Sequence, residues 1–170
     1  MAVKDFTLTQ ENLHNLFYYK NGQLFWKPFF GTRNRISRKS NKPVGSFKTD
    51  YITVSINNKI YYVHRMIFMF HHGYLPQQID HIDNNKINNK IENLRKADFS
   101  SNAWNKKTYK NNTSGVKGVS WYTREQKWVA ELALYSKKIR IGSFDSVELA
   151  KIAIEKARKK YHGEFSNNGY

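Results

Sequence analysis

Apolar residues in the first half of the chain alternate between a helical and a strand-like spacing. Leu13, Leu16 and Phe17 recur at helical spacing behind Thr9, a residue type that caps helices, and this predicts a short amphipathic helix. Apolar and polar residues alternate on both sides of Asn57 and Asn58, which accept positive φ, and this predicts a β-hairpin. The expected elements are a helix over 9–19, a strand over 23–26, hairpin strands over 51–56 and 59–63, and a helix over 64–72 that ends at Gly73.

Beyond Pro76 the apolar runs become shorter, and polar segments rich in asparagine separate them. Two short strand-like runs flank a polar loop, a helix follows with a cap at Asp98 or Ser100, and three strands precede a final helix capped by Ser146. The expected ranges are 79–83 and 91–95 for the first two strands, 98–107 for the helix, and 118–122, 128–132 and 138–142 for the later strands. The buried stripe of the last helix is expected to comprise Val147, Ala150, Ala153, Ile154, Ala157 and Tyr161.

This order of elements predicts an α+β protein built from two small modules. A chain of 170 residues is long enough for one ordinary domain or two small ones, and it buries only a modest core. The segment 108–115 is polar, basic and poor in apolar residues, as linkers are. We therefore expect an N-terminal module over 1–107, a linker over 108–115, and a C-terminal module over 116–170 made of a three-stranded antiparallel sheet and one helix.

The charge of the chain points to a polyanionic partner. Its formal net charge is +16 and its pI is about 9.9, so the surface potential is positive over most of the molecule. Nucleic acid is the leading partner, with a merely solvated basic surface or a basic membrane-binding segment as the alternatives. An irregular arm over 27–48 has no acidic residue, and it is either a phosphate-binding element or a solvated loop. Its candidate DNA contacts are Arg33, Arg35, Arg38 and Lys39.

The absence of some residue types narrows the chemistry. The chain has no cysteine, so disulfides and thiolate zinc sites are excluded, and any metal must be held by oxygen atoms and imidazole. No apolar run approaches the ~18 residues of a membrane span, and the first residues lack the apolar core of a signal peptide. We expect a cytoplasmic protein without membrane contact, and a bacterial, phage or organellar source would look alike.

A small set of polar residues fits phosphodiester hydrolysis. That reaction needs a nucleophilic water, a base for its proton, and positive charge on the phosphate and the departing oxygen. Asp80 and His81 are adjacent on an expected strand, so one can bind an ion while the other acts as base. Asn102 lies on the following helix, and an oxygen-only pair with Asp80 suits Mg²⁺ or Mn²⁺. An aspartate followed by a histidine also fits an ordinary ion pair or a capped turn.

The wider motif resembles the ββα-metal core of HNH endonucleases, in particular the phage and intron-encoded homing branch. It runs from Asp80 and His81 through Asn88 and Asn89 to Glu92-Asn93-Leu94-Arg95 and Asn102, and the resemblance covers about residues 6–110. It implies that Asp80 and Asn102 bind the metal, that His81 is the general base, and that Asn93 braces the hairpin that carries the catalytic site. Because the last ligand is Asn102 and not a histidine, it implies Mg²⁺ or Mn²⁺ in preference to zinc or nickel. His64 either touches the phosphate or packs internally.

The C-terminal module resembles an AP2 DNA-binding domain over residues 114–168. The likeness rests on Gly118-Val119, the run 127–132, the run 141–145 and the helix that ends in Tyr161-His162-Gly163. Arginines of the plant family are replaced here by residues such as Ser120 and Ala133, so no site preference is carried over. Trp121 and Trp128 are alternatively core aromatics. The resemblance implies DNA contacts by Lys117, Trp121, Lys127, Trp128 and Arg140, to which we add Arg124.

These observations predict a metal-dependent homing-type endonuclease that cuts double-stranded DNA, either by nicking or by double-strand cleavage. A non-enzymatic DNA-binding regulator that uses the same fold only to grip DNA is the alternative. An RNA-binding protein is a third option, because positive charge and aromatic residues also suit single strands. One active site per chain leaves both a monomer and a homodimer open.

Overall fold

The computed structural model describes residues 6–28, 42–48, 50–108, 110–135 and 137–169. Its helices and small sheets confirm the α+β class, and the chain forms two compact units, Met1–Lys96 and Ala97–Tyr170. The division falls ahead of the expected linker at 108–115, and those module boundaries stay a prediction. Among the described residues, no helix is long and apolar enough to cross a membrane.

The first unit begins with a helix and a tight hairpin. The helix α1 (Gln10–Leu16) is capped by Thr9, whose hydroxyl accepts a hydrogen bond from the backbone N–H of Asn12. The strands β1 (Phe17–Lys20) and β2 (Gln23–Trp26) follow and pair antiparallel. The expected helix end at residue 19 was therefore wrong. Phe17 instead starts β1, where it is fully buried and pairs with Trp26, so pairing with β2 outweighs the helical pattern.

A three-stranded sheet and a second helix complete the scaffold of the first unit. The strands are β3 (Ser46–Lys48), β4 (Tyr51–Ile56) and β5 (Lys59–Tyr62), in the order β3-β4-β5. The expected hairpin between β4 and β5 is confirmed, with φ of 51° at Asn57 and 62° at Asn58. The exposed three-residue strand β3 was not foreseen. The helix α2 (Val63–His72) ends as expected at Gly73, in the left-handed conformation with φ of 74°.

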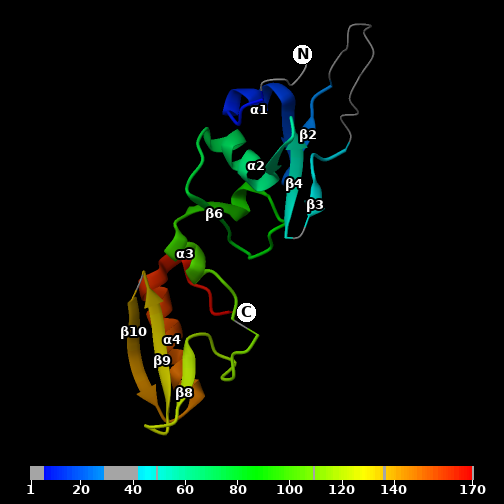
Figure 1. The fold of residues 1–170 in the computed structure, drawn as a ribbon. Coiled ribbons are helices and arrows are strands. Elements are labelled where there is room, and N and C mark those ends of the chain that lie inside the picture. Colours follow the sequence, from blue (N-terminus) through cyan, green and yellow to red (C-terminus); the bar gives the residue numbers. More distant parts are fainter. Residues whose placement is uncertain (1–5, 29–41, 49, 109, 136, 170) are drawn as a thin grey trace, which may run out of the picture. The chain divides into compact units, whose positions relative to one another are not determined.

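The core of the first unit lies between the two helices and the strands. Figure 1 shows α1 and α2 side by side against β2 and β4, and α2 contacts each of these elements. The fully buried side chains of this core include Leu13, Phe17, Leu24, Met66 and Ile67. This core supports the short strands β6 (Gln78–His81) and β7 (Leu94–Ala97), which pair with each other. A 3₁₀ turn at Ile91–Asn93 precedes β7, so this strand begins at Leu94 and not at residue 91, where the sequence predicted its start.

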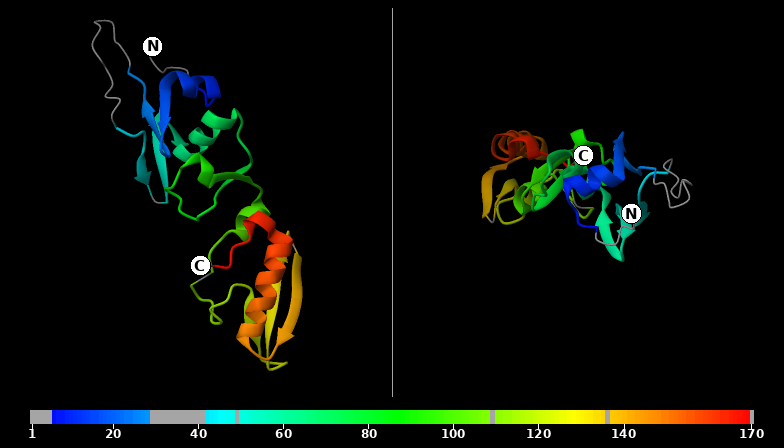
Figure 2. Two further views of the ribbon diagram at one scale, coloured as in Figure 1. Left: turned by 180° about the vertical axis from the view of Figure 1, so that it is seen from behind. Right: turned by 90° about the horizontal axis from the view of Figure 1, so that it is seen from above.

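The second unit joins a short helix to a sheet covered by a long helix. The helix α3 (Phe99–Trp104) is capped by Asp98, as expected, but it ends three residues before 107. The strands β8 (Val119–Tyr122), β9 (Lys127–Leu134) and β10 (Lys137–Phe144) pair antiparallel in the order β10-β9-β8. The helix α4 (Val147–His162) is capped by Ser146 and lies along one face of this sheet (Figure 2). The expected three strands and closing helix are therefore confirmed.

The buried stripe of α4 differs from the expected one at its C-terminal end. Ala150, Ile154 and Ala157 are buried as expected, whereas Tyr161 is 41% exposed. Arg158 and His162 are buried instead. The guanidinium of Arg158 donates to the backbone carbonyl of Lys117 and to Asn168 Oδ1, both at 2.6 Å. The imidazole of His162 stacks on Trp104 with ring centroids 4.3 Å apart. Specific hydrogen bonds and stacking thus place polar side chains where periodicity predicted an apolar one.

Candidate active site

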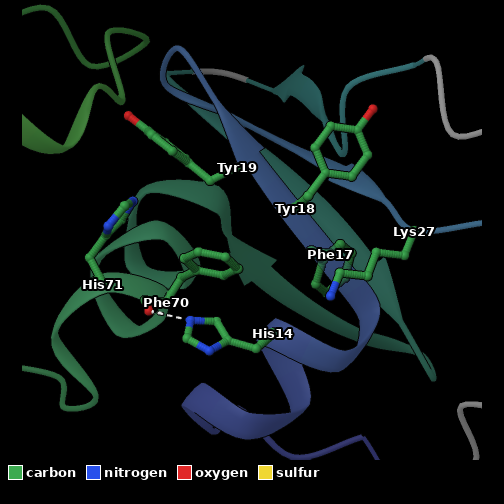
Figure 3. A pocket seen from close by; sticks show the side chains of 7 residues that line it. All are labelled: His14, Phe17, Tyr18, Tyr19, Lys27, Phe70 and His71. Atoms are coloured by element: carbon green, nitrogen blue, oxygen red, sulfur yellow. Dashed lines mark hydrogen bonds between the residues drawn. The ribbon is translucent and has the colours of Figure 1, made fainter.

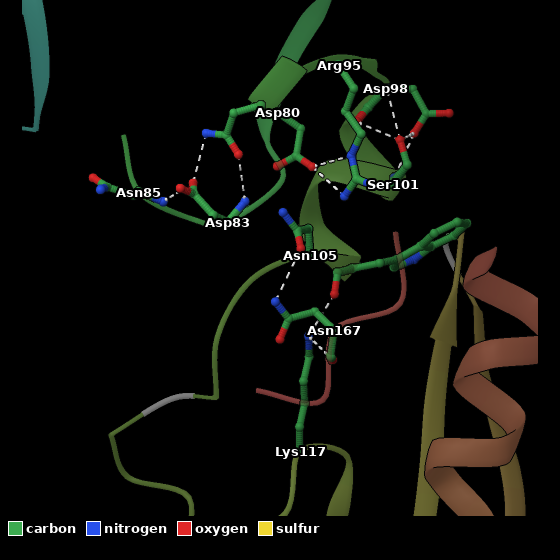
Figure 4. Close-up of polar contacts among 11 residues, drawn as sticks. Asp80, Asp83, Asn85, Arg95, Asp98, Ser101, Asn105, Lys117 and Asn167 are labelled. Carbon is green, nitrogen blue, oxygen red and sulfur yellow. Dashed lines mark hydrogen bonds and ion pairs between the residues drawn. The ribbon is translucent and has the colours of Figure 1, made fainter. Parts of the chain in front are cut away.

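Asp80 and His81 stand at the end of β6, and each is only 5% exposed. A buried carboxylate needs a compensating cation, and Arg95 on β7 supplies it. The Nε and Nη2 atoms of Arg95 lie 2.8 and 2.7 Å from Asp80 Oδ2. Figure 4 shows the guanidinium turned toward this carboxylate. Asp80 therefore occupies a position that attracts positive charge. Arg95 belonged to the motif in the sequence but was assigned no role there.

Asn93 ties the loop after β6 to the start of β7. Its side-chain Oδ1 accepts from the backbone N–H of Asp83 at 3.1 Å. Its Nδ2 donates to Asp83 Oδ1 at 2.9 Å and to the carbonyl of Asn88 at 2.8 Å. The backbone carbonyl of Asn93 also accepts from the N–H of Ile82 at 3.0 Å. The amide thus spans both sides of the loop that follows His81, which is the geometry expected of a brace.

The carboxylate of Asp83 organises the same loop from within. It accepts from the backbone N–H of Asn85 at 2.8 Å and from the side chain of Asn88 at 2.7 Å, in addition to Asn93. Burial alone would raise the pKa of this carboxyl. The hydrogen bonds from Asn88, Asn85 and Asn93 together outweigh burial and hold the pKa of Asp83 below its ordinary value. The loop is therefore built around an ionised aspartate.

His81 is held by a residue to which the sequence assigned no role. Its Nε2 lies 3.0 Å from Oδ1 of Asn89, which is 2% exposed. The ring also packs against His64, with centroids 5.3 Å apart. Asn89 stood in the motif beside Asn88, and only the fold shows that Asn88 binds Asp83 while Asn89 turns toward the imidazole.

His64 packs inside an aromatic cluster next to His81. Its ring centroid lies 5.1 Å from that of Tyr51 and 5.7 Å from that of Tyr62. His64 is 8% exposed, and its Nδ1 has no hydrogen-bond partner among the described residues. Burial, together with the neighbouring His81 and Arg65, lowers the pKa of His64 to about 3. Of the two expectations for His64, internal packing fits this environment.

The predicted metal ligands come from different units. Asp80 belongs to the first unit together with His81 and Asn93, whereas Asn102 lies on α3 of the second. No cluster of three His, Cys, Asp or Glu side chains able to hold a metal occurs in the described part of the chain. Asp80 offers a carboxylate oxygen and Asn102 an amide oxygen, and a hard divalent cation accepts both types of ligand. The pairing of Asp80 with Asn102 stays a prediction.

Among the predicted DNA contacts, Lys117 has an internal environment. Its ammonium donates to the backbone carbonyls of Trp104, Lys106 and Asn167 at 2.7, 2.5 and 3.2 Å. Figure 4 shows it beside Asn167. Burial, and then the charge of Arg158, lowers the pKa of Lys117 to about 8. A phosphate could reach this ammonium only at the expense of bonds that join α3 to the C-terminal tail.

The remaining predicted contacts divide between surface and core. Trp128 packs against the core of the second unit, and its neighbour Trp121 is 43% exposed, with the two ring centroids 5.2 Å apart. Lys127 pairs with Asp145 and Arg140 with Glu125, both at 2.5 Å. Arg124 is exposed in the turn between β8 and β9. Arg33, Arg35, Arg38 and Lys39 lie outside the described residues.

A separate pocket of about 450 Å³ lies in the first unit, beside α1 and the C-terminal end of α2. Figure 3 shows its lining side chains, among which the imidazole of His14 is hydrogen-bonded through Nε2 to the carbonyl of Phe70 at 2.8 Å. None of Asp80, His81 or Asn93 lines it. Its lining residues are His14, Phe17, Tyr18, Tyr19, Lys27, Phe70 and His71.

Comparisons with known proteins identify an HNH endonuclease segment in this chain. The model of the HNH endonuclease family matches residues 61–103, a segment that contains Asp80, His81, Asn93 and Asn102. "Protein 3.8" of Escherichia phage T7 is 36% identical over 105 residues, which cover 61% of this chain and 86% of that protein. No solved structure matches the chain.

The buried pair of Asp80 and Arg95 yields a stability prediction. Arg95→Met should lower the free energy of unfolding by about 3 kcal/mol, because it removes the cation that compensates a buried carboxylate. Asp80→Asn combined with Arg95→Met should recover at least half of that loss. Urea unfolding of the three proteins measures both effects. Equal stability of the single and double variants would contradict the pairing.

The burial of His64 yields a pH prediction. Because its folded-state pKa of about 3 lies below the ordinary 6.5, the unfolded chain binds more protons between these values. The stability associated with neutral His64 is complete above pH 6.5 and is lost as the pH falls toward 3, with a loss of about 2 kcal/mol at pH 5. His64→Phe should reduce the difference in unfolding free energy between pH 7.5 and pH 5. An unchanged difference would show that His64 takes up its proton freely in the folded protein.

Proposed function

Because this chain belongs to the same family as Protein 3.8 of phage T7 and carries an HNH endonuclease domain, we propose that it is a metal-dependent endonuclease that hydrolyses phosphodiester bonds in double-stranded DNA. The observation that supports this most strongly is the arrangement around β6. A buried carboxylate and a buried imidazole are consecutive residues there, and Asn93 braces the loop that follows them.

In the proposed reaction each residue has a separate task. His81 takes a proton from the attacking water, while Asp80 and Asn102 hold a divalent cation near the scissile phosphate. When bound, Mg²⁺ or Mn²⁺ supplies positive charge to the phosphate oxygens and to the 3′ oxygen that leaves. Asn93 contributes by keeping the loop behind His81 in one conformation, which preserves the distance between base and phosphate.

The donor set supports the choice of cation. A carboxylate and an amide offer only oxygen, which suits Mg²⁺ and Mn²⁺ better than zinc or nickel. Arg95 already binds one oxygen of Asp80, so it would orient the carboxylate for the cation. In this proposal Arg95 acts through Asp80 and makes no contact with the reacting atoms.

We propose that the basic surface and an AP2-like second unit bind the DNA. The net charge of +16 favours phosphate contacts throughout the chain. On the second unit Trp121, Arg124, Lys127 and Arg140 are the proposed contacts, because they are at least partly exposed on or beside the sheet. Lys117 and Trp128 are better explained as structural residues. The proposed arm contacts are Arg33, Arg35, Arg38 and Lys39.

The proposed setting is a phage-encoded homing-type enzyme that acts in the cytoplasm of a host cell. The phage relative supports the phage origin in this proposal. One His81 per chain means that a monomer would nick a single strand. Cutting both strands would need two chains or two successive events.

Cleavage of supercoiled plasmid tests the proposed reaction. The protein with Mg²⁺ should convert supercoiled DNA to the nicked form, and EDTA should abolish the conversion. His81→Ala should lower the rate by at least about 100-fold, the usual contribution of a general base. If the parent protein binds DNA but does not cleave it with any metal, the result would favour the non-enzymatic DNA-binding regulator instead. Activity that survives EDTA would exclude the metal-dependent mechanism.

Salt-dependent binding tests the proposed DNA contacts of the second unit. If Lys127 neutralises a phosphate, Lys127→Gln should weaken duplex binding and reduce the slope of log K against log salt by about 1. The matched control is Lys156→Gln, because Lys156 is exposed on α4, which covers the other face of the sheet. Equal slopes for the two variants would argue against DNA binding through this sheet.

A further inference from the structure

We propose that Asn89 is a positioning residue that fixes the tautomer of His81, so that the proton is on Nε2 and the lone pair on Nδ1. This inference rests on the proposed function, because it assigns the nitrogen that acts as base. Nothing in the family comparison or in the motif spacing distinguishes the two imidazole nitrogens.

The contact between the two side chains sets the direction of the hydrogen bond. Oδ1 of Asn89 lies 3.0 Å from Nε2 of His81. A carbonyl oxygen only accepts, so Nε2 must carry the hydrogen and donate it. A neutral imidazole with its proton on Nε2 has its lone pair on Nδ1. The orientation of one amide thus determines which side of the ring accepts a proton.

Asn89 is well placed to hold this orientation. It is 2% exposed, and its backbone N–H donates to the carbonyl of Ile87 at 3.1 Å. The next residues are secured by the N-terminal hairpin, where the hydroxyl of Tyr19 accepts from the N–H of Ile91 at 3.0 Å. The turn at Gly22 approaches so closely that an added Cβ would lie 2.9 Å from the backbone nitrogen of Lys90. The hairpin β1–β2 therefore supports the segment that carries Asn89.

The other end of the amide indicates a functional role. Nδ2 of Asn89 is buried and has no hydrogen-bond partner among the described residues. A buried donor without a partner reduces stability, so packing alone does not favour an asparagine at this position. The contact with His81 is what the residue contributes.

The assigned tautomer leads to a balanced proton path. Nδ1 of His81 accepts a proton as the O–H bond of the attacking water breaks. The oxygen of that water bonds to phosphorus, the bond from phosphorus to the 3′ oxygen breaks, and the 3′ oxygen leaves with the electron pair and is protonated by solvent. Asn89 exchanges no atom in this sequence, and it keeps the hydrogen on Nε2 throughout.

Nitrogen-15 NMR of the full chain labelled at histidine tests the tautomer directly. With the imidazole neutral, His81 should show a protonated Nε2 and an unprotonated Nδ1, assigned by comparison with His81→Gln. The reverse pattern would overturn the inference, because the amide of Asn89 would then present its donor to the ring. This measurement needs no variant of Asn89 and no DNA.

Variants of Asn89 then separate positioning from folding. Asn89→Leu has no acceptor, so the His81 tautomer should become mixed and kcat for plasmid nicking should fall by about 10- to 100-fold, with the DNA dissociation constant unchanged. Asn89→Asp keeps an acceptor oxygen and should keep the Nε2–H form. The matched control is Lys90→Gln, which alters the exposed side chain next to Asn89 and should leave the His81 tautomer unchanged.

The outcomes distinguish this inference from the proposed function. A chain that nicks DNA but shows the Nδ1–H form, or whose Asn89→Leu variant keeps both tautomer and kcat, overturns the role of Asn89 alone. A chain that does not nick DNA under any metal condition overturns the proposed function, whatever tautomer the NMR spectrum shows.

Discussion

The hydrogen-bond network between Asp83 and Asn93 is the constraint on which the rest of the candidate site depends. Nine of the twelve residues between β6 and β7 are polar, and of the three isoleucines only Ile91 packs against the core, so burial of apolar surface contributes little to the order of this loop. Its conformation rests on the carboxylate of Asp83 and the amide of Asn93, which between them bind both ends of the loop. The same loop carries Asn89, which contacts His81. Loss of these hydrogen bonds would therefore displace the proposed base.

Burial determines the charge of the groups around β6. Asp80 is ionised in the proposed mechanism, and the guanidinium of Arg95 makes that compatible with a 5% exposed side chain. His64 is buried among aromatic rings, and its lowered pKa keeps it neutral. The carboxylate of Asp80 is therefore paired with a cation, and neutral His64 adds no charge beside His81.

Local sequence patterns correctly predicted the helix ends and turns that depend on a capping residue or on a residue that adopts positive φ. Thr9, Ser146 and Gly73 were identified as helix ends because capping depends on residues within one turn of each other. The Asn57 and Asn58 turn was identified for the same reason. Phe17 was misassigned because Leu13, Leu16 and Phe17 fit a helix equally well, and only the partner strand β2 made pairing more favourable.

The sequence by itself determined the fold class, the order of the elements, the excess of positive charge, and the residue types from which Asp80, His81, Asn93 and Asn102 were selected. Tertiary structure alone decided what each side chain contacts. Arg95 binds Asp80, Asn89 turns to His81, and Lys117 binds three backbone carbonyls although the AP2 resemblance implied a DNA contact. Spacing along the chain records which residues are neighbours in sequence, whereas burial and hydrogen bonding between distant segments decide whether a charged or amide group meets solvent, backbone or another side chain.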